Sequence, residues 1–125
     1  MPKLKLTIGD VVINADLLDT PTADALYAAA PFSASANTWG EEVYFDTPCN
    51  CPQEADARTV VELGELAYWM GGDAIAICYG RTPVSQGDES RLISPGNVFA
   101  TTQDDVKQLS RVRGGASITV EKSDA

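Results

Sequence analysis

The stretch that decides the fold is RTVVELGELAYWMGGDAIAICY, residues 58–79. It predicts a meander of three strands joined by tight glycine-containing turns, at residues 58–63, 66–70 and 74–79. The third strand, AIAICY, has no polar face, and such a strand is expected to be buried on both sides. A closed or nearly closed β-barrel would explain this double burial. A two-sheet sandwich with a helical cap is the alternative.

Outward from this stretch, alternating apolar and polar residues predict further short strands. The first two form a hairpin around Gly9-Asp10, and the others follow at residues 32–37, 41–45, 97–102 and 116–122. Two short helices are expected. Thr20 would cap the first, which ends before Pro31, and Thr102 with Asp105 forms a capping-box pattern for the second. The sequence therefore predicts a mostly β fold, a barrel of about eight strands with two short helices.

Length and charge narrow the range of partners. A chain of 125 residues fits a single domain, 1–125. Its formal net charge of −9 would repel phosphates, so no nucleic-acid partner is expected. No stretch is long and apolar enough for a signal peptide or a membrane span, so we expect a cytoplasmic protein without membrane contact.

The chemistry available in the side chains is limited by the absence of histidine. Nucleophilic systems that need a histidine base are excluded within the chain. The cysteines Cys49 and Cys51 form a C-x-C pattern without the partners of a zinc site, so neither a metal nor a cofactor is predicted. Neighbouring residues of a strand point to opposite faces, so Glu41 and Glu42 are not expected to flank one scissile bond.

Two groups of residues are candidates for binding. One is the aromatic set, which either fills the core and scatters over the surface or lines a groove: Trp39, Tyr44, Tyr68, Trp69 and Tyr79. The other is the long polar loop from Gly80 to about Pro95, with Arg81 at its start and the hydroxyls of Thr82 and Ser85 close by. An arginine on such a loop could receive a carboxylate or a carbonyl, or it could pair with the nearby acidic residues.

Three segments, WGEEVYFDTP (39–48), VVELGELAYWMGGDAIAICYGRTPVS (60–85) and LISPGNVFA (92–100), resemble the family of small bacterial and archaeal cyclophilin-like proteins. The matching positions include Trp39-Gly40, Tyr68-Trp69 and the loop motif of Gly80, Thr82, Pro83 and Ser85. The resemblance covers nearly the whole chain and implies the cyclophilin-like closed β-barrel. The chain departs from the family pattern at Glu65, where aspartate is usual, and at residues 99–102, where a glycine-containing segment is usual.

Several functions are compatible with this resemblance, because fold alone does not transmit activity. We expect a module that binds a small polar ligand or an extended peptide through Arg81, Thr82, Ser85, Trp39, Tyr44 and Trp69, with Arg81 as the anchor. One alternative is a weak peptidyl-prolyl isomerase. We do not expect an efficient one, because the Phe-His-Arg motif of true cyclophilins is absent. Another alternative is a subunit of a larger enzyme assembly. A homodimer formed through the N-terminal hairpin as an exposed edge is also possible.

Overall fold

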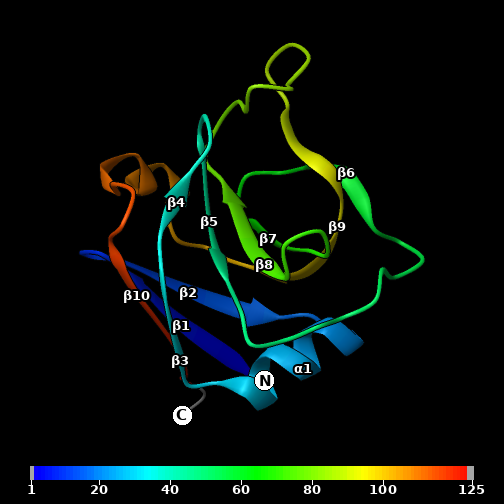
Figure 1. Ribbon diagram of the computed structural model, residues 1–125, viewed down its shortest axis with the longest axis vertical. Helices are drawn as coiled ribbons and strands as arrows, with labels where there is room; N and C mark the ends of the chain where they lie inside the picture. Colours follow the sequence, from blue (N-terminus) through cyan, green and yellow to red (C-terminus); the bar gives the residue numbers. More distant parts are fainter. Residues whose placement is uncertain (1, 124–125) are drawn as a thin grey trace.

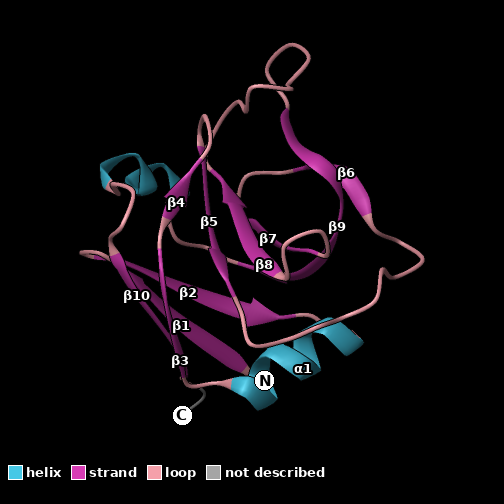
Figure 2. Cartoon of the chain, viewed as in Figure 1, coloured by secondary structure: helices cyan, strands magenta, loops and turns pink. Residues whose placement is uncertain are grey.

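The computed structural model describes residues 2–123, and this part of the chain is mostly β. Figures 1 and 2 show strands that curve around a common interior, with one helix covering one end. The ten strands of the described residues are β1 (Lys3–Ile8), β2 (Val11–Leu17), β3 (Phe32–Ser35), β4 (Asn37–Thr38), β5 (Glu42–Asp46), β6 (Arg58–Val61), β7 (Glu65–Trp69), β8 (Ala74–Cys78), β9 (Ser90–Thr101) and β10 (Ser117–Lys122).

All ten strands belong to one sheet that nearly closes into a barrel. The order is β3-β10-β1-β2-β9-β7-β8-β5-β4, and β6 pairs with β9 beside this path. The two ends of the path, β3 and β4, are consecutive in the chain and are separated by Ala36 alone. The backbone of Ala36 donates to the Ala116 carbonyl and accepts from Gly115 N–H. The predicted barrel is confirmed, and the predicted strand at 32–37 is divided in two at this buried alanine.

The interior of the barrel is filled by the apolar face of each alternating strand. The predicted inward residues Leu4, Leu6 and Ile8 of β1, and Ile118 and Val120 of β10, are all at most 1% exposed. Because burying one leucine or isoleucine side chain contributes about 1.5–3 kcal/mol, this repeated alternation drives the closure of the sheet. From β5 and β8 the interior receives Val43, Phe45, Ile75 and Ile77.

Helix α1 (Pro21–Ala29) matches its prediction. The Thr20 side chain accepts from Ala23 N–H, proline occupies the first turn, and Ala30 before Pro31 is already extended. The second helix, η1 (Val106–Arg111), is a 3₁₀ helix capped by Asp105. The predicted cap, Thr102, is wrong, because its hydroxyl donates instead to the Asn14 carbonyl on β2.

Residues 58–79, predicted as a three-stranded meander, pair differently in the structure. Strands β7 and β8 are neighbours as predicted, but β6 pairs with β9 and not with β7. Strand β9 is also longer than expected, so the predicted loop that runs to Pro95 ends at Glu89. Ser94, Pro95 and Gly96 interrupt the alternation inside β9, and for this reason the sequence pattern indicated only its second half. The loop that remains between β8 and β9 projects away from the barrel in Figure 1.

The N-terminal hairpin is only in part the exposed edge that the sequence suggested. Strand β1 lies between β10 and β2, and β2 pairs with β9 at Asp16 and Leu17. At Asn14 the backbone N–H donates to Asp104 Oδ2, 2.7 Å away, and the carbonyl accepts from the Thr102 hydroxyl. Dimerisation itself stays a prediction. Among the described residues, no helix has both the length and the apolar character needed to cross a membrane.

Candidate functional site

Strands β5 and β8 divide their side chains between two environments. In their antiparallel register Glu42 lies opposite Cys78, and Tyr44 lies opposite Ala76. These four side chains point away from the barrel interior, because their neighbours in each strand point into it. The double burial predicted for 74–79 is confirmed for 74–78, the five residues of β8, which are buried on one side by the barrel interior and on the other by a second cluster; Tyr79 is partly exposed.

This second cluster is small and lies outside the barrel wall. It contains Val61, Ala67, Ala76, Cys78 and Leu92, with Tyr44 and Val98 packed against it. Strand β6 and the first half of β9 supply Val61 and Leu92. The pairing of β6 with β9, which the meander prediction missed, thus brings apolar side chains over the outer face of β8.

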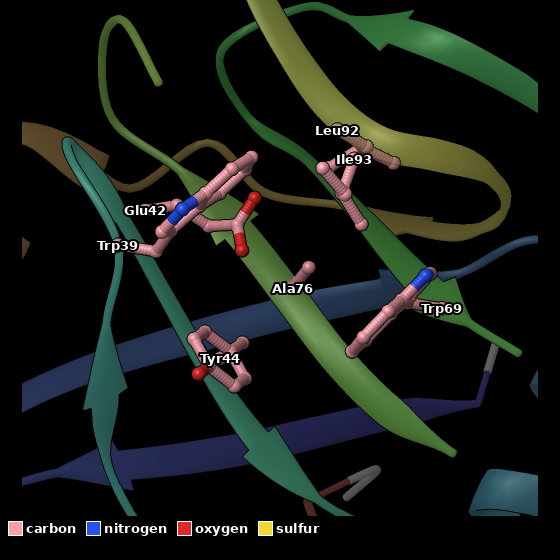
Figure 3. Close-up of a pocket in the computed structure, with 7 residues that line it drawn as sticks. All are labelled: Trp39, Glu42, Tyr44, Trp69, Ala76, Leu92 and Ile93. Carbon is pink, nitrogen blue, oxygen red and sulfur yellow. The ribbon is translucent and has the colours of Figure 1, made fainter. Parts of the chain in front are cut away.

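A pocket opens on this outer face, with a cavity volume of about 200 Å³. Figure 3 shows Ala76 at its floor, Trp39 and Tyr44 on one side, and Trp69 with Ile93 on the other. Its lining residues are Trp39, Glu42, Tyr44, Trp69, Ala76, Leu92 and Ile93. Ile93 is 55% exposed, so an apolar side chain stands at the rim in contact with solvent. The lining combines three aromatic side chains, three aliphatic ones and a single carboxyl group.

That carboxyl group belongs to Glu42, which is only 6% exposed. Burial raises its pKa from 4.5 to about 7, and the hydrogen bond from Cys78 lowers it again in part. The Cys78 Sγ lies 3.6 Å from Glu42 Oε1, and burial raises the pKa of this thiol, with the charge of Glu42 adding to the effect. None of the seven lining residues is a lysine or an arginine. The pocket therefore holds a carboxyl group whose protonation changes near neutral pH.

The indole of Trp69 is held in place from two directions. Its Nε1–H donates to Ser94 Oγ at 2.7 Å, across the β7–β9 pairing. The turn after β7 lies directly against the ring: a Cβ added at Gly71 or Gly72 would stand 2.8 or 2.7 Å from its carbon atoms. Only glycine allows this approach. One wall of the pocket is consequently rigid.

The opposite wall depends on the turn between β4 and β5. Gly40 has a φ of +58°, and a Cβ there would lie 2.7 Å from Pro83 Cδ. Next to it, Trp39 N–H donates to the Glu42 carbonyl at 3.0 Å. The Gly80–Ser85 loop supports the pocket through this contact between Gly40 and Pro83.

The structure brings together half of the binding residues that the sequence suggested. Trp39, Tyr44 and Trp69 line the pocket, whereas Arg81, Thr82 and Ser85 do not. Thr82 is buried and donates its hydroxyl to the Arg91 carbonyl, and its N–H donates to Ser85 Oγ at 2.9 Å. Arg81 has an exposed side chain, and its backbone N–H donates to Glu41 Oε1 at 3.1 Å. A ligand-binding role for these three residues stays a prediction.

The lining residues that sequence reasoning missed are Glu42, Ala76, Leu92 and Ile93. Alternation correctly separated Glu42 from Glu41: the former is buried and the latter exposed. The overlooked indication was that Glu42 shares a strand face with Tyr44, which was already a candidate. Ala76 could be recognised as a lining residue only from the β5–β8 register. Leu92 and Ile93 could be recognised only once the first half of β9, which the sequence assigned to a loop, was known to be a strand.

The cysteine-containing loop 47–57 belongs to the barrel's structure and lies away from this pocket. The Tyr68 hydroxyl, inside the core, donates to Asp73 Oδ1 at 2.7 Å and accepts from Cys51 N–H at 3.0 Å. Buried Asn97 accepts from Glu54 N–H at 2.8 Å. Cys49 and Cys51 are free thiols whose pKa values are raised, mainly by burial. Within residues 2–123, no group of three or more Cys, Asp or Glu side chains is placed to hold a metal ion.

The fold and the site together define a small β-barrel protein with an aromatic pocket on its outer wall. The family model described as cyclophilin-like matches residues 2–121, and the chain belongs to this family. Both the predicted resemblance and the predicted fold are thereby confirmed.

Two solved structures share the fold. A hypothetical protein of Archaeoglobus fulgidus, known from a solution structure, is 31% identical, with a TM-score of 0.83 over 98% of this chain and 95% of that one. McbB, solved in complex with tryptophan, is 15% identical, with a TM-score of 0.69. The match to McbB covers all of this chain but 45% of McbB. None of the curated proteins compared with the chain matches it.

Proposed function

We propose that this protein is a binding module that holds a small molecule with an aromatic or apolar body in the outer-wall pocket. The observation that carries the proposal is the convergence of Trp39, Tyr44 and Trp69 on one cavity with an apolar floor. Small-molecule sites are typically concave and mostly apolar, with a few polar groups that fix orientation. Glu42 is such a group here.

The size of the cavity limits the ligand. At about 200 Å³ it is smaller than the roughly 300–1,000 Å³ of sites for drug-sized molecules. One aromatic ring system with a short polar substituent suits this volume. The small polar ligand first expected from the sequence suits the lining less well, since Glu42 is its only charged side chain. An extended peptide would place one side chain in the pocket and run onward over the exposed rim at Ile93.

The fold neighbour McbB adds support of a general kind. It was solved in complex with tryptophan, a small molecule with an aromatic body. Because the match covers 45% of McbB, this complex supports a comparable ligand class for the present chain only at the level of a protein that contains the fold.

The two alternative functions have less support. Prolyl isomerisation is helped by a cation near the prolyl nitrogen, but the pocket lining contains no cation and Arg81 lies outside it. A role as a subunit of a larger assembly stays a prediction. The geometry of the pocket neither supports nor opposes it.

The experiment that tests the proposal uses the two tryptophans of the chain, both of which line the pocket. In ¹H–¹⁵N spectra their two indole N–H signals report directly on occupancy. We expect aromatic compounds from a small-molecule panel to shift both signals in a saturable manner. The variant Ala76→Leu, which fills the pocket from its floor, should abolish the shifts while the backbone spectrum stays folded. The proposal is wrong if no compound shifts the signals, or if Ala76→Leu leaves the shifts unchanged.

A further inference from the structure

The Glu42 carboxyl group has more capacity to accept hydrogen bonds than the protein uses. An ionised carboxylate offers about four acceptor sites, whereas its side chain is bonded only to the Cys78 thiol among the described residues. A thiol is a weak donor. Figure 3 shows both carboxyl oxygens pointing into the cavity, toward the space between Trp39 and the β9 residues. An almost fully buried carboxyl group thus presents unused acceptor sites to the position of a ligand.

The surroundings of Glu42 favour positive charge in this cavity. The faces of tryptophan and tyrosine rings carry a negative quadrupole, and a cation close to such a face is stabilised by about 0.5–2 kcal/mol. Trp39, Tyr44 and Trp69 supply three such rings. With no lysine or arginine in the lining, the protein itself does not neutralise the carboxylate there.

We propose that the pocket selects organic cations: amines whose ammonium group pairs with the Glu42 carboxylate while an aromatic or apolar body packs between Trp39 and Trp69. This inference rests on the proposed function and names its ligand class. A buried carboxylate without a partner is unfavourable, and an ammonium ligand removes that penalty, whereas a neutral ligand does not. An anionic ligand would add a second negative charge beside Glu42, and the pocket rejects it.

The test compares three probes that share an indole body and differ in charge. Tryptamine carries an ammonium group, 3-propylindole replaces it with a methyl group, and indole-3-propionate replaces it with a carboxylate. Binding to the full chain is measured at about pH 8, where Glu42 is ionised, by following the Trp39 and Trp69 indole signals. We expect tryptamine to bind at least about tenfold more tightly than 3-propylindole, and indole-3-propionate to bind most weakly.

Two variants assign this preference to one carboxyl group. Glu42→Gln keeps the shape of the side chain and removes its charge, so we expect tryptamine affinity to fall about tenfold and 3-propylindole affinity to stay within about twofold. Glu41→Gln is the matched control, because Glu41 is the neighbouring residue on the opposite, exposed side. It should leave both affinities unchanged.

The outcomes separate this inference from the function on which it rests. If 3-propylindole or indole-3-propionate binds as tightly as tryptamine, or if Glu42→Gln keeps the preference for tryptamine, cation selection is wrong and the binding pocket stands. If none of the three probes shifts the tryptophan signals at about 1 mM, the proposed function fails for ligands of this size, and the inference fails with it.

Discussion

The Cys78 thiol donates a hydrogen bond to the Glu42 carboxyl group across the β5–β8 pairing, with 3.6 Å between Sγ and Oε1. This contact joins the one carboxyl group of the pocket lining to a residue that the sequence assigned to the core. Because the bond stabilises the ionised form, it opposes part of the effect of burial on the Glu42 pKa.

Replacing Cys78 should therefore shift the titration of Glu42 in a predictable direction. Cys78→Ala removes the donor, so we expect the Glu42 pKa to rise above its value of about 7. Cys78→Ser supplies a stronger donor and should lower it. The measurement is the pH dependence of the Glu42 side-chain carboxyl signal in ¹³C spectra. An unchanged pKa in both variants would show that the thiol does not influence the carboxyl group.

Glu42 should also make the stability of the protein depend on pH between about 4.5 and 7. The folded state holds the proton over this range while the unfolded state has released it, so the stabilisation is complete below 4.5 and is lost as the pH rises through 7. At about 1.4 kcal/mol per pKa unit between about 4.5 and about 7, the complete loss is about 3–4 kcal/mol.

Glu42→Gln isolates this contribution, since its side chain stays neutral. Between pH 5 and pH 8 the original chain should lose about 2–3 kcal/mol of unfolding free energy through Glu42, and the variant should not show this loss. The variant should therefore gain stability relative to the original chain as the pH rises. Urea denaturation at several pH values measures the difference, with Glu41→Gln as a control that shows no such change. Parallel pH profiles for Glu42→Gln and the original chain would contradict a raised pKa for Glu42.

The turn at Gly40 should tolerate no side chain. Gly40→Ala places a Cβ 2.7 Å from Pro83 Cδ in a backbone with φ of +58°, so we expect a loss of about 2 kcal/mol in unfolding free energy and a shift of the Trp39 indole signal. Gly114→Ala is the control, because nothing lies within 4 Å of its added Cβ. Equal stability of the two variants would show that the contact with Pro83 does not constrain the turn.

The Tyr68 hydroxyl should stabilise the cysteine-containing loop. Tyr68→Phe leaves the Cys51 N–H without its acceptor and removes one of the two donors to the Asp73 carboxylate, the other being Asn50, and we expect a loss of about 1–3 kcal/mol on urea denaturation. Tyr79→Phe is a suitable comparison, because the Tyr79 hydroxyl forms no hydrogen bond in the described part of the chain. A Tyr68→Phe variant as stable as Tyr79→Phe would mean that the loop is held by other contacts.

The barrel could be predicted from the sequence because its strands, turns and helix cap are specified by residues that lie close together in the chain. The alternation in residues 3–8 and 11–17, the glycine turns and the Thr20 cap each depend on a few neighbouring residues, and all of them are found in the structure. The pairing of β6 with β9 could not be predicted in this way, because it joins segments about 30 residues apart through a strand interrupted by Pro95.

The pocket was partly predictable for the same reason. Trp39, Tyr44 and Trp69 were candidates because aromatic side chains are common in binding sites. Strand alternation also placed Trp69 and Tyr68 on opposite faces, and the structure shows this arrangement. Glu42 became a candidate only when the register placed it opposite Cys78, beneath a strand that the sequence assigned to a loop. Conversely, Thr82 and Ser85 looked like ligand donors, but they bind the backbone and each other.

The alternation along β5 and β8 has a consequence for how this protein can evolve. Residues 43, 45, 75 and 77 face the barrel interior, whereas residues 42, 44 and 76 line the pocket and residue 78 packs in the buried cluster on the same outer face. Neighbouring residues of these two strands thus face two separate environments, the pocket lining and the barrel interior. On the proposed function, exchange of these lining residues would change the ligand while the residues of the barrel interior stay the same.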